Sequence, residues 1–424
     1  MASSAAASTI SSSVRVAIIG GGVSGSASAR RLAQLAPSAR ITLYEMGRGL
    51  GGRASTRKTR SVPHIYINHG APYADVRSKL GRSLISSLGP SGTAPFSGVR
   101  GFLDSKTGTF APGDGEKEGV DYVTGAKGEM SQIASAMISG IPSIDTKFKT
   151  MIRGLSRSPS GEWQLLDKSE EVIGSADWLI VAGSGVAHLR WSKTFGGEPP
   201  LIAAEKARPD PKLREALDAI ASHEASPVLA VFFSCSGPTA RKWLSLDFDV
   251  ADVNGSSILS RIMIQGKQKD KNSSQSDGGG DEWCSVVLHS TEEFALQNSG
   301  VYGSSSSATR IGDAASDASR ENSLISDMMV AMNEIPGMPE INTKLQDESY
   351  SSRYDYGPVI HRWGNAFPKG DALAEDLAFL PSSRIAFCGD YVDTSNPARF
   401  GSFESALLSG TWAGEQVSQF CQKD

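Results

Sequence analysis

VRVAIIGGGVSGSASARRLAQLAPSARITLYE, residues 14–45, is the stretch that decides the fold. Its first six residues are a β-branched apolar run, which predicts a buried parallel strand. A G-x-G-x-x-G turn follows at 20–25, an Ala- and Leu-rich segment as far as 35 predicts a helix, and 40–45 predicts a second strand. Strand, glycine turn, helix and acid-terminated strand within roughly 30 residues indicate a dinucleotide-binding βαβ unit.

The three motif glycines have separate physical roles in this interpretation. Gly20 allows the tight turn, Gly22 lets the backbone approach a pyrophosphate without a Cβ in the way, and Gly25 lets the helix pack closely on the strand. The helix N-terminus, at Val23 and Ser24, offers free N–H groups and about half a positive charge to the phosphates. We therefore expect these five residues to bind the cofactor.

Glu45 and a second motif narrow the choice of cofactor. A carboxylate at the end of the second strand can accept ribose hydroxyls and disfavours a 2′-phosphate, so FAD or NAD is preferred over NADP. R-x-x-G-G-R at 48–53 places Arg48, Gly52 and Arg53 where backbone N–H groups and a guanidinium can face a second phosphate segment. The alternative for this motif is a solvated basic loop, because further basic residues follow it.

The succession of these two motifs resembles the flavoprotein amine-oxidase superfamily, and the resemblance implies bound FAD. It extends to residues 384–390, a strand ending in Gly-Asp, and to a small-residue helix that begins near residue 400. In that superfamily such an Asp binds the ribityl or pyrophosphate region, and the helix N-terminus points at the flavin pyrimidine. The residues that the resemblance assigns to FAD are Gly389, Asp390, Gly401, Ser402 and Phe403, with Ala182 at the end of a further strand and the backbone of Phe148 near the adenine.

A closer resemblance is to renalase-like FAD/NAD(P)-binding oxidoreductases of the plant type. The segments that carry it are 68–73 (NHGAPY), 125–133, 282–294 and 354–368. The first of these segments implies that Gly70 and Ala71 contact the cofactor. Asn68 stands where the family has an acid and Pro72 where it has Gln, and these two departures bear on substrate chemistry more than on FAD binding.

Composition limits the classes of function. The chain has 424 residues, enough for two domains, and a net charge of −4, so we expect neither a nucleic-acid-binding surface nor attraction to an anionic membrane. No apolar run reaches about 18 residues, so no transmembrane segment is expected. The four cysteines are scattered and the six histidines lack metal-ligand spacing, so no metal site is expected. Residues 1–13 are Ser/Ala-rich without acid, which fits a transit-peptide remnant and a disordered start equally, so chloroplast and cytoplasm both stay open.

The predicted fold class is α/β, with a Rossmann-type FAD-binding domain and an α+β substrate domain that contains a mixed or antiparallel sheet. The FAD-binding domain is discontinuous, and its expected segments are 14–90, 122–195 and 376–424. The substrate domain is expected to take 91–121 and 196–375, with mobile loops at the Ser/Gly/Asp-rich tracts 267–281 and 299–319.

Candidate substrate-contacting residues lie on a strand expected within 354–368. His361 and Trp363 alternate on it, so both can face the flavin and orient a nicotinamide-like or amine substrate. Tyr73 and His69 are further candidates, and ordinary core packing is the alternative for all four. Because a flavin carries the redox step itself, no Ser/His/Asp set is required.

These observations favour an FAD-dependent oxidase that transfers a hydride from a small organic substrate to flavin, which O2 or another acceptor reoxidises. The resemblance to renalases implies a dihydronicotinamide isomer, related to NAD(P)H, as a candidate substrate. An amine oxidase or a desaturase is a second hypothesis, and a flavin-binding protein without catalysis is a third. The substrate, the electron acceptor and the oligomeric state stay open at this level.

Overall fold

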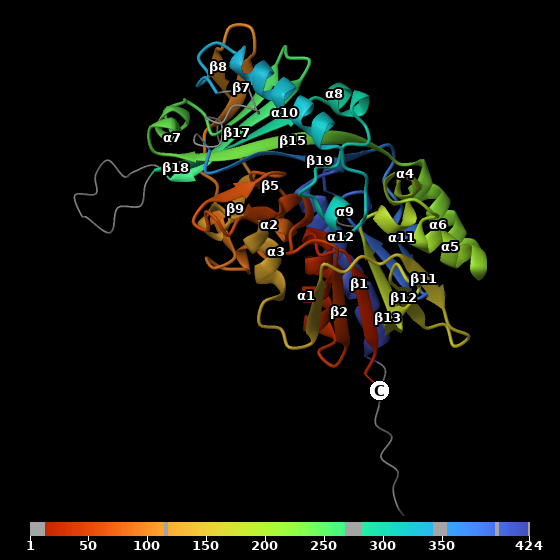
Figure 1. Cartoon of the computed structure of the whole chain (residues 1–424). Helices are drawn as coiled ribbons and strands as arrows, with labels where there is room; N and C mark the ends of the chain where they lie inside the picture. Colours follow the sequence, from red (N-terminus) through yellow and green to blue (C-terminus); the bar gives the residue numbers. More distant parts are fainter. Residues whose placement is uncertain (1–12, 114–117, 268–281, 342–353, 395–397, 423–424) are drawn as a thin grey trace, which may run out of the picture.

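The structure is a computed structural model that describes residues 13–113, 118–267, 282–341, 354–394 and 398–422. Two large sheets dominate it, and Figure 1 shows them as two stacked parts, with helix α10 (Ala318–Asn333) above the upper one. The expected fold class, a Rossmann-type α/β unit combined with a mixed sheet, is confirmed. Residues 268–281 of one expected loop, and residues 1–12 of the Ser/Ala-rich start, lie outside the described residues.

The lower sheet contains the βαβ unit, and its strand order is β10-β2-β1-β14-β21-β20. The bounds are β10 Ile144–Phe148, β2 Arg40–Glu45, β1 Arg15–Ile19, β14 Trp178–Ala182, β21 Ile385–Cys388 and β20 Phe379–Leu380. All neighbours are parallel except β20, which pairs antiparallel at the edge. Val16 and Ile18 of β1 are at most 1% exposed, as a central strand covered on both faces requires.

Helix α1 (Val23–Leu35) and the C-terminal helix α12 (Phe403–Cys421) pack against each other beside this sheet (Figure 1). A small residue makes their close approach possible, because a Cβ on Gly410 would lie 2.2 Å from the backbone oxygen of Ser24. The last helix of the chain is thereby held against the first, next to the glycine turn.

The upper sheet has the strand order β19-β15-β18-β17-β16-β7-β8, and β16 and β7 form its one parallel pair among the described residues. The bounds are β19 Tyr356–Lys369, β15 Glu224–Ser236, β18 Trp283–Ser290, β17 Leu259–Lys267, β16 Val250–Asn254, β7 Arg100–Asp104 and β8 Phe110–Pro112. Side chains along β15 alternate, so that Leu229, Val231 and Phe233 join the core with α10 while Ala230 and Phe232 face the other way. The second face is directed toward the lower sheet (Figure 1).

Shorter elements connect the two parts. One small sheet pairs β3 (Thr56–Lys58) with β4 (Tyr66–Asn68). Another has the order β5 (Ala74–Val76), β9 (Asp121–Gly125), β6 (Thr93–Pro95). A further one has the order β11 (Gly154–Arg157), β12 (Trp163–Leu166), β13 (Val172–Ala176). Other helices are α2 Lys79–Ser86, α3 Ser131–Ile138, α4 Arg190–Phe195, α5 Pro200–Ala207, α6 Pro211–Ser222, α7 Gly237–Leu244, α8 Glu292–Gln297, α9 Ser307–Arg310 and α11 Glu375–Ala378, with short 3-10 turns η1 Gly52–Ala54, η2 Ala126–Gly128 and η3 Gly185–Ala187. None of the helices in the described segments is both long and apolar enough to span a bilayer.

The expected domain boundary at residue 196 differs from the structure. Helices α5 and α6 fall within the segment assigned to the substrate domain, but Leu201, Leu213 and Ile220 are buried in the core of the lower part. The apolar faces of these two helices explain the difference, because they pack beside β11 and η3 rather than on the upper sheet.

The expectation of an unpacked, mobile loop at 299–319 is wrong. This segment contains α9 and the first residues of α10, and Val301 and Ser306 are buried. The polar residues that suggested an unpacked tract include helix N-caps, since Ser306 caps α9 and Asp317 caps α10.

Candidate cofactor and substrate site

The glycine turn between β1 and α1 leaves space only at its middle glycine. Gly20 has a φ of +108°, and a Cβ on Gly25 would lie 1.9 Å from the Gly20 oxygen, so neither position accepts a side chain. Gly22 differs, because the nearest atom to a Cβ there is the Gly52 Cα at 3.9 Å. The space at Gly22 is what close approach of a ligand to the backbone requires.

The first turn of α1 follows directly from this open position. Gly22 is the N-cap and provides no side-chain acceptor, so the N–H groups at the start of the helix, where Val23 and Ser24 lie, have no cap within the turn. Orphan N–H groups of this kind are suited to binding anions, and anion binding by these two residues stays a prediction.

Glu45 lies at the side of the same turn. Its carboxylate accepts hydrogen bonds from the N–H groups of Gly21 (2.7 Å) and Gly47 (2.5 Å). Burial raises the pKa of Glu45, and these two N–H donors offset part of that rise. Each carboxylate oxygen keeps a second lone pair, so the group can still accept a ribose hydroxyl.

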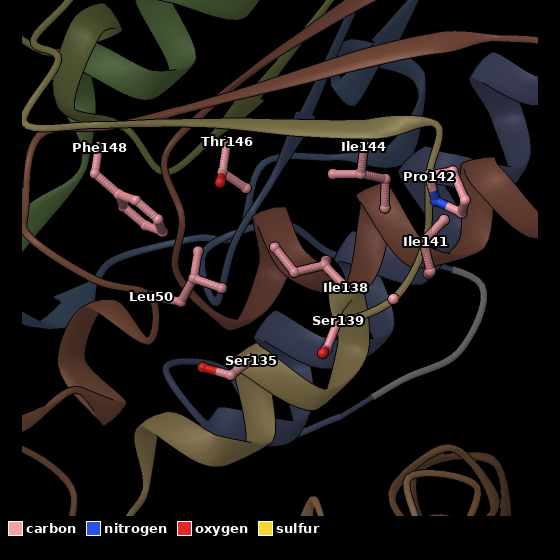
Figure 2. Close-up of a pocket in the computed structure, with 10 residues that line it drawn as sticks. Leu50, Ser135, Ile138, Ser139, Ile141, Pro142, Ile144, Thr146 and Phe148 are labelled. Atoms are coloured by element: carbon pink, nitrogen blue, oxygen red, sulfur yellow. The ribbon is translucent and has the colours of Figure 1, made fainter.

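Phe148 lies beside Glu45, because the register of β10 and β2 pairs the two residues. A cavity of about 460 Å³ lies between β10 and α3, and Figure 2 shows Leu50, Thr146 and Phe148 among the side chains around it. Leu50 also borders the glycine turn, since its Cδ2 would be 2.9 Å from a Cβ on Gly21. The structure thus brings the residue expected near adenine to the carboxylate expected near ribose.

Arg53 of the R-x-x-G-G-R motif has a partner that the sequence did not reveal. Its two terminal nitrogens each lie 2.6 Å from one carboxylate oxygen of Asp390, and one of them also donates to the Ala366 oxygen at 2.8 Å. Burial lowers the pKa of Arg53, but the Asp390 charge and hydrogen bonds outweigh it, so the pKa is raised overall. Arg48, at the start of the same motif, is exposed.

The 68–73 segment is attached to this motif through the backbone. The Ala71 N–H donates to the Arg53 oxygen at 2.9 Å, and a Cβ on Gly70 would lie 2.1 Å from that same oxygen. Three motifs that are distant in the sequence, including the C-terminal Gly-Asp, therefore meet around Arg53.

The N-terminus of α12 is positioned by the same carboxyl-terminal motif. The Gly401 N–H donates to the backbone oxygen of Asp390 at 2.9 Å. Ser402 caps the helix by accepting the N–H of Ser405 at 3.0 Å, and Phe403 is the first helical residue. The helix dipole at this end favours negative charge in front of it.

Further backbone positions with open space lie directly after β14 and within β19. Ala182 pairs with the last residue of β21, directly before Gly389. A Cβ on Gly183, Gly185 or Gly364 would meet no atom within 4 Å. The open space at Gly183 and Gly185 leaves the backbone after β14 accessible to a ligand.

Four rings, which we call the aromatic cluster, meet where β19 approaches the 68–73 segment: His69, Phe232, His361 and Trp363. The His69 centroid lies 5.1 Å from each of the other three, and His361 lies 4.3 Å from Trp363. The His69 backbone oxygen contacts Trp363 Nε1 at 3.1 Å and His289 Nε2 at 3.0 Å. Nδ1 of His69 and Nδ1 of His361 are buried without a hydrogen-bond partner among the described residues.

The histidines around this cluster are held uncharged. Burial lowers the pKa of His361 to about 3 and that of His289 to about 4, and it lowers the pKa of His69 well below the usual range. The nearby charge of Arg57 lowers the pKa of His69 and His361 further. At neutral pH these rings are therefore hydrogen-bonding and packing groups rather than proton donors of ordinary acidity.

Tyr73 lies in a neighbouring aromatic group. Its ring stacks on Phe96 at 4.7 Å and meets Tyr122 edge-on at 5.8 Å, with the Arg100 guanidinium carbon 5.3 Å from its centroid. The structure therefore brings three of the four expected substrate-side residues together, namely His69, His361 and Trp363, and places Tyr73 with β6 and β9.

Asn68, which stands where the renalase-like family has an acid, makes hydrogen bonds that explain the amide at this position. Its Oδ1 accepts from Thr56 Oγ1 (2.7 Å) and the Met130 N–H (3.1 Å), while its Nδ2 donates to the Gly128 oxygen (2.8 Å). An ionised acid cannot make the donor contact, so the amide suits this buried position. Pro72 is also buried and offers no polar side-chain group.

Two residues next to the aromatic cluster were missed from the sequence. Arg57 lies within a basic run that indicated a solvated loop, and no local pattern shows that β3 turns this side chain toward Phe232. His289 had a usable signal, because it alternates with Val287 on a strand whose other face carries the apolar side chains of Cys284, Val286 and Leu288.

Comparison with known proteins agrees with this geometry. The family model for an NAD(P)-binding Rossmann-like domain matches residues 18–79. No curated protein sequence matches the chain. A solved structure of a putative protoporphyrinogen oxidase from Exiguobacterium sp. 255-15 is 13% identical, with 96% of this chain and 99% of that chain covered and a TM-score of 0.59.

Two further solved structures have the same fold. A triple mutant of putrescine oxidase is 12% identical, with 96% of this chain and 99% of that chain covered and a TM-score of 0.55. The structure of 2,6-dihydroxypyridine-3-hydroxylase from Arthrobacter nicotinovorans is 12% identical, with 97% of this chain and 85% of that chain covered and a TM-score of 0.51. The chain therefore contains a Rossmann-like NAD(P)-binding domain, and it shares its overall fold with these solved structures.

Proposed function

We propose that this protein is an FAD-dependent oxidoreductase that takes a hydride from a small organic substrate. The observation that carries the proposal is a path of motif residues in contact with one another: the open position at Gly22 faces Gly52, Arg53 next to it pairs with Asp390, and Asp390 accepts the N–H of Gly401 before α12. The aromatic cluster lies over the same region, since Trp363 contacts the segment that is bonded to Arg53. A nucleotide path that ends beneath buried rings is an arrangement that suits a redox cofactor and an organic substrate.

The residues along this path fit FAD in order. Glu45 and the backbone at Phe148 would hold the adenosine, and Gly22 with the first turn of α1 would hold the pyrophosphate. Arg53, fixed by Asp390, would balance phosphate charge. Gly70, Ala71 and the start of α12 would lie along the flavin end, where the helix N-terminus favours negative charge.

FAD, when bound, would supply the two-electron redox chemistry. The chain itself would orient the substrate with Trp363 and His361, and it would exclude water with the aromatic cluster, in which His69 and Phe232 are buried. The uncharged state of His361 and His69 means that neither ring protonates the substrate at neutral pH. Hydride removal needs no side-chain base, which agrees with these neutral groups.

Within this class, we propose a dihydronicotinamide isomer as the substrate, on the basis of the segments that resemble renalases. An anaerobic donor screen tests both levels. Purified protein should absorb near about 450 nm, as oxidised protein-bound flavin does. Bleaching of that band by 6-dihydroNAD supports the finer proposal, whereas bleaching by amines alone replaces it with an amine oxidase.

The same screen contains the outcomes that oppose the broader proposal. A flavin that binds but is bleached by no donor in a wide panel would point to a flavin-binding protein without catalysis. A folded but colourless protein that ignores added FAD would contradict the cofactor assignment itself.

A further inference from the structure

Arg57, on β3, is a cation among uncharged partners. Its NH1 donates to the Tyr356 hydroxyl at 2.8 Å and to Ser305 Oγ at 3.1 Å, and its guanidinium carbon lies 5.1 Å from the Phe232 centroid. The ion pairs among the described residues include none with Arg57. The guanidinium therefore lies against the aromatic cluster with no carboxylate from this part of the chain to balance it.

The two histidines next to Arg57 add no negative charge. The pKa of His69 and the pKa of His361 are lowered by burial and by Arg57 itself, so both rings are neutral at pH 7. The buried Nδ1 atoms of these two histidines have no hydrogen-bond partner among the described residues. Charge and unused hydrogen-bonding capacity thus occur together on one side of the cluster.

A second arginine contributes charge of the same sign beside the apolar layer to which Phe232 belongs. The Arg100 guanidinium carbon lies 3.4 Å from the Tyr122 centroid and 5.3 Å from that of Tyr73. Tyr73 and Phe232 both pack in the apolar layer on the inner face of the upper sheet. Both cations are therefore held over aromatic faces next to that layer.

Elementary electrostatics indicates which substrate such a region accepts. A partly buried guanidinium without a counter-charge gains most from an anion, and its planar fork suits a carboxylate or phosphate. A cationic amine would meet like charge in a poorly solvated site. Flat rings on the remaining walls favour a planar group attached to that anion.

We infer that Arg57 is a specificity-determining residue that anchors the carboxylate or phosphate of an anionic, ring-containing substrate beside the aromatic cluster. The inference rests on the proposed function only in taking this cluster as the substrate side of the flavin. It assigns the substrate a charge, which the general class of reaction does not.

Four probes of similar shape and different charge test the inference: benzoate, phenyl phosphate, benzamide and benzylamine. Each is titrated by calorimetry into the protein as purified and again after loading with FAD. We expect the tighter of the two anions to bind at least about tenfold more strongly than benzamide or benzylamine, as a charge-assisted hydrogen bond implies. The ranking of benzoate against phenyl phosphate tells a carboxylate site from a phosphate site.

Variants of two arginines in the same segment give a matched comparison. Arg57→Gln should abolish the preference for anions while benzamide binding persists, and Arg57→Lys should keep part of it. Arg60→Gln, at an exposed position, should leave the preference unchanged. If Arg57→Gln fails to fold, the ranking for the unaltered protein and for Arg57→Lys still decides.

Three results would overturn the inference. Benzylamine could bind more tightly than both anions, or the preference for anions could survive Arg57→Gln. The third is that no probe binds to the FAD-loaded protein. Failure of the proposed function gives a different result, because a protein that takes up no FAD can still show the anion preference. The visible flavin spectrum, recorded on the same samples, separates the two.

Discussion

Arg53 and Asp390 lie 337 positions apart in the chain and form a two-point ion pair, with both nitrogen–oxygen distances at 2.6 Å. The Asp390 side chain is 5% exposed and that of Arg53 36%. This pair joins the loop after β2 to the loop after β21, so the two halves of the expected FAD site are fixed to each other. Its removal should therefore affect both stability and cofactor retention.

Arg53→Met should lower the free energy of unfolding by about 3 kcal/mol, because it leaves the Asp390 carboxylate buried without its partner. Adding Asp390→Asn to that variant should recover part of the loss, since the charge that needed a partner is then gone. Urea unfolding of both single variants and of the double variant measures the coupling. Strictly additive losses would show that the two side chains do not stabilise each other.

Protonation of His289 should make stability fall in acid. Its folded-state pKa, lowered by burial to about 4, is below the unfolded value of 6.5, so the unfolded chain binds the proton first. The stability that this group contributes is complete above pH 6.5 and is lost as the pH falls toward 4, by about 2–3 kcal/mol at pH 4.5.

His289→Gln tests this origin of the acid sensitivity, because Gln keeps a side-chain donor for the His69 oxygen and does not titrate. The variant should lose less stability than the unaltered protein between pH 7 and pH 4.5. His64→Gln, at an exposed position, is the control. Equal losses for His289→Gln and His64→Gln would assign the acid sensitivity to other groups.

Native thiols should be nearly unreactive. Cys235 and Cys284 are scattered in sequence but face each other across β15 and β18 with sulfur atoms 3.4 Å apart, and all four cysteines are buried. The hydrogen bond with Cys235 and burial raise the pKa of Cys284, and burial raises the pKa of Cys388 to about 12 and that of Cys421 to about 11.

Reaction with a thiol-specific disulfide reagent at pH 8 should accordingly be at least about 100-fold slower in the folded protein than in urea. Four thiols per chain should appear when the protein unfolds. A rapid phase that releases even one thiol from the folded protein would contradict the buried positions.

Gly25→Ala should destabilise the fold itself. The added Cβ would lie 1.9 Å from the Gly20 oxygen and 3.1 Å from the Ala182 Cβ, so α1 would have to move away from the sheet. Overpacking of this kind costs about 1–3 kcal/mol or more. A thermal or urea unfolding curve that matches the unaltered protein would show that α1 is not held where the structure places it.

The sequence was informative where a pattern is local. The order of strand, glycine turn and helix in 14–45 predicted β1, α1 and β2, because period and glycine spacing depend only on neighbouring residues. The pairing of Arg53 with Asp390 and of Arg57 with Tyr356 could not be predicted, since each joins strands or loops that only the folded topology brings together. Segment 299–319 was misjudged for a related reason, because composition does not tell a helix-capping serine from one in an unpacked tract.

Gly22 provides the most direct test that the glycine path holds FAD. Its φ of −72° and ψ of −172° are open to any residue, and only the Gly52 Cα comes within 4 Å of an added Cβ. Gly22→Val should therefore fold normally yet block the space for the pyrophosphate. Gly113→Val, at a position where the nearest atom to a Cβ is 3.5 Å away, is the matched control outside the path.

The measurement is a fluorescence titration of FAD into the unaltered protein, Gly22→Val and Gly113→Val, with urea unfolding of each to show that all three are folded. We predict that the unaltered protein and Gly113→Val bind FAD alike, and that Gly22→Val loses at least about 100-fold in affinity without losing stability. Equal FAD affinity in Gly22→Val and the unaltered protein would contradict the assignment of this path to the cofactor.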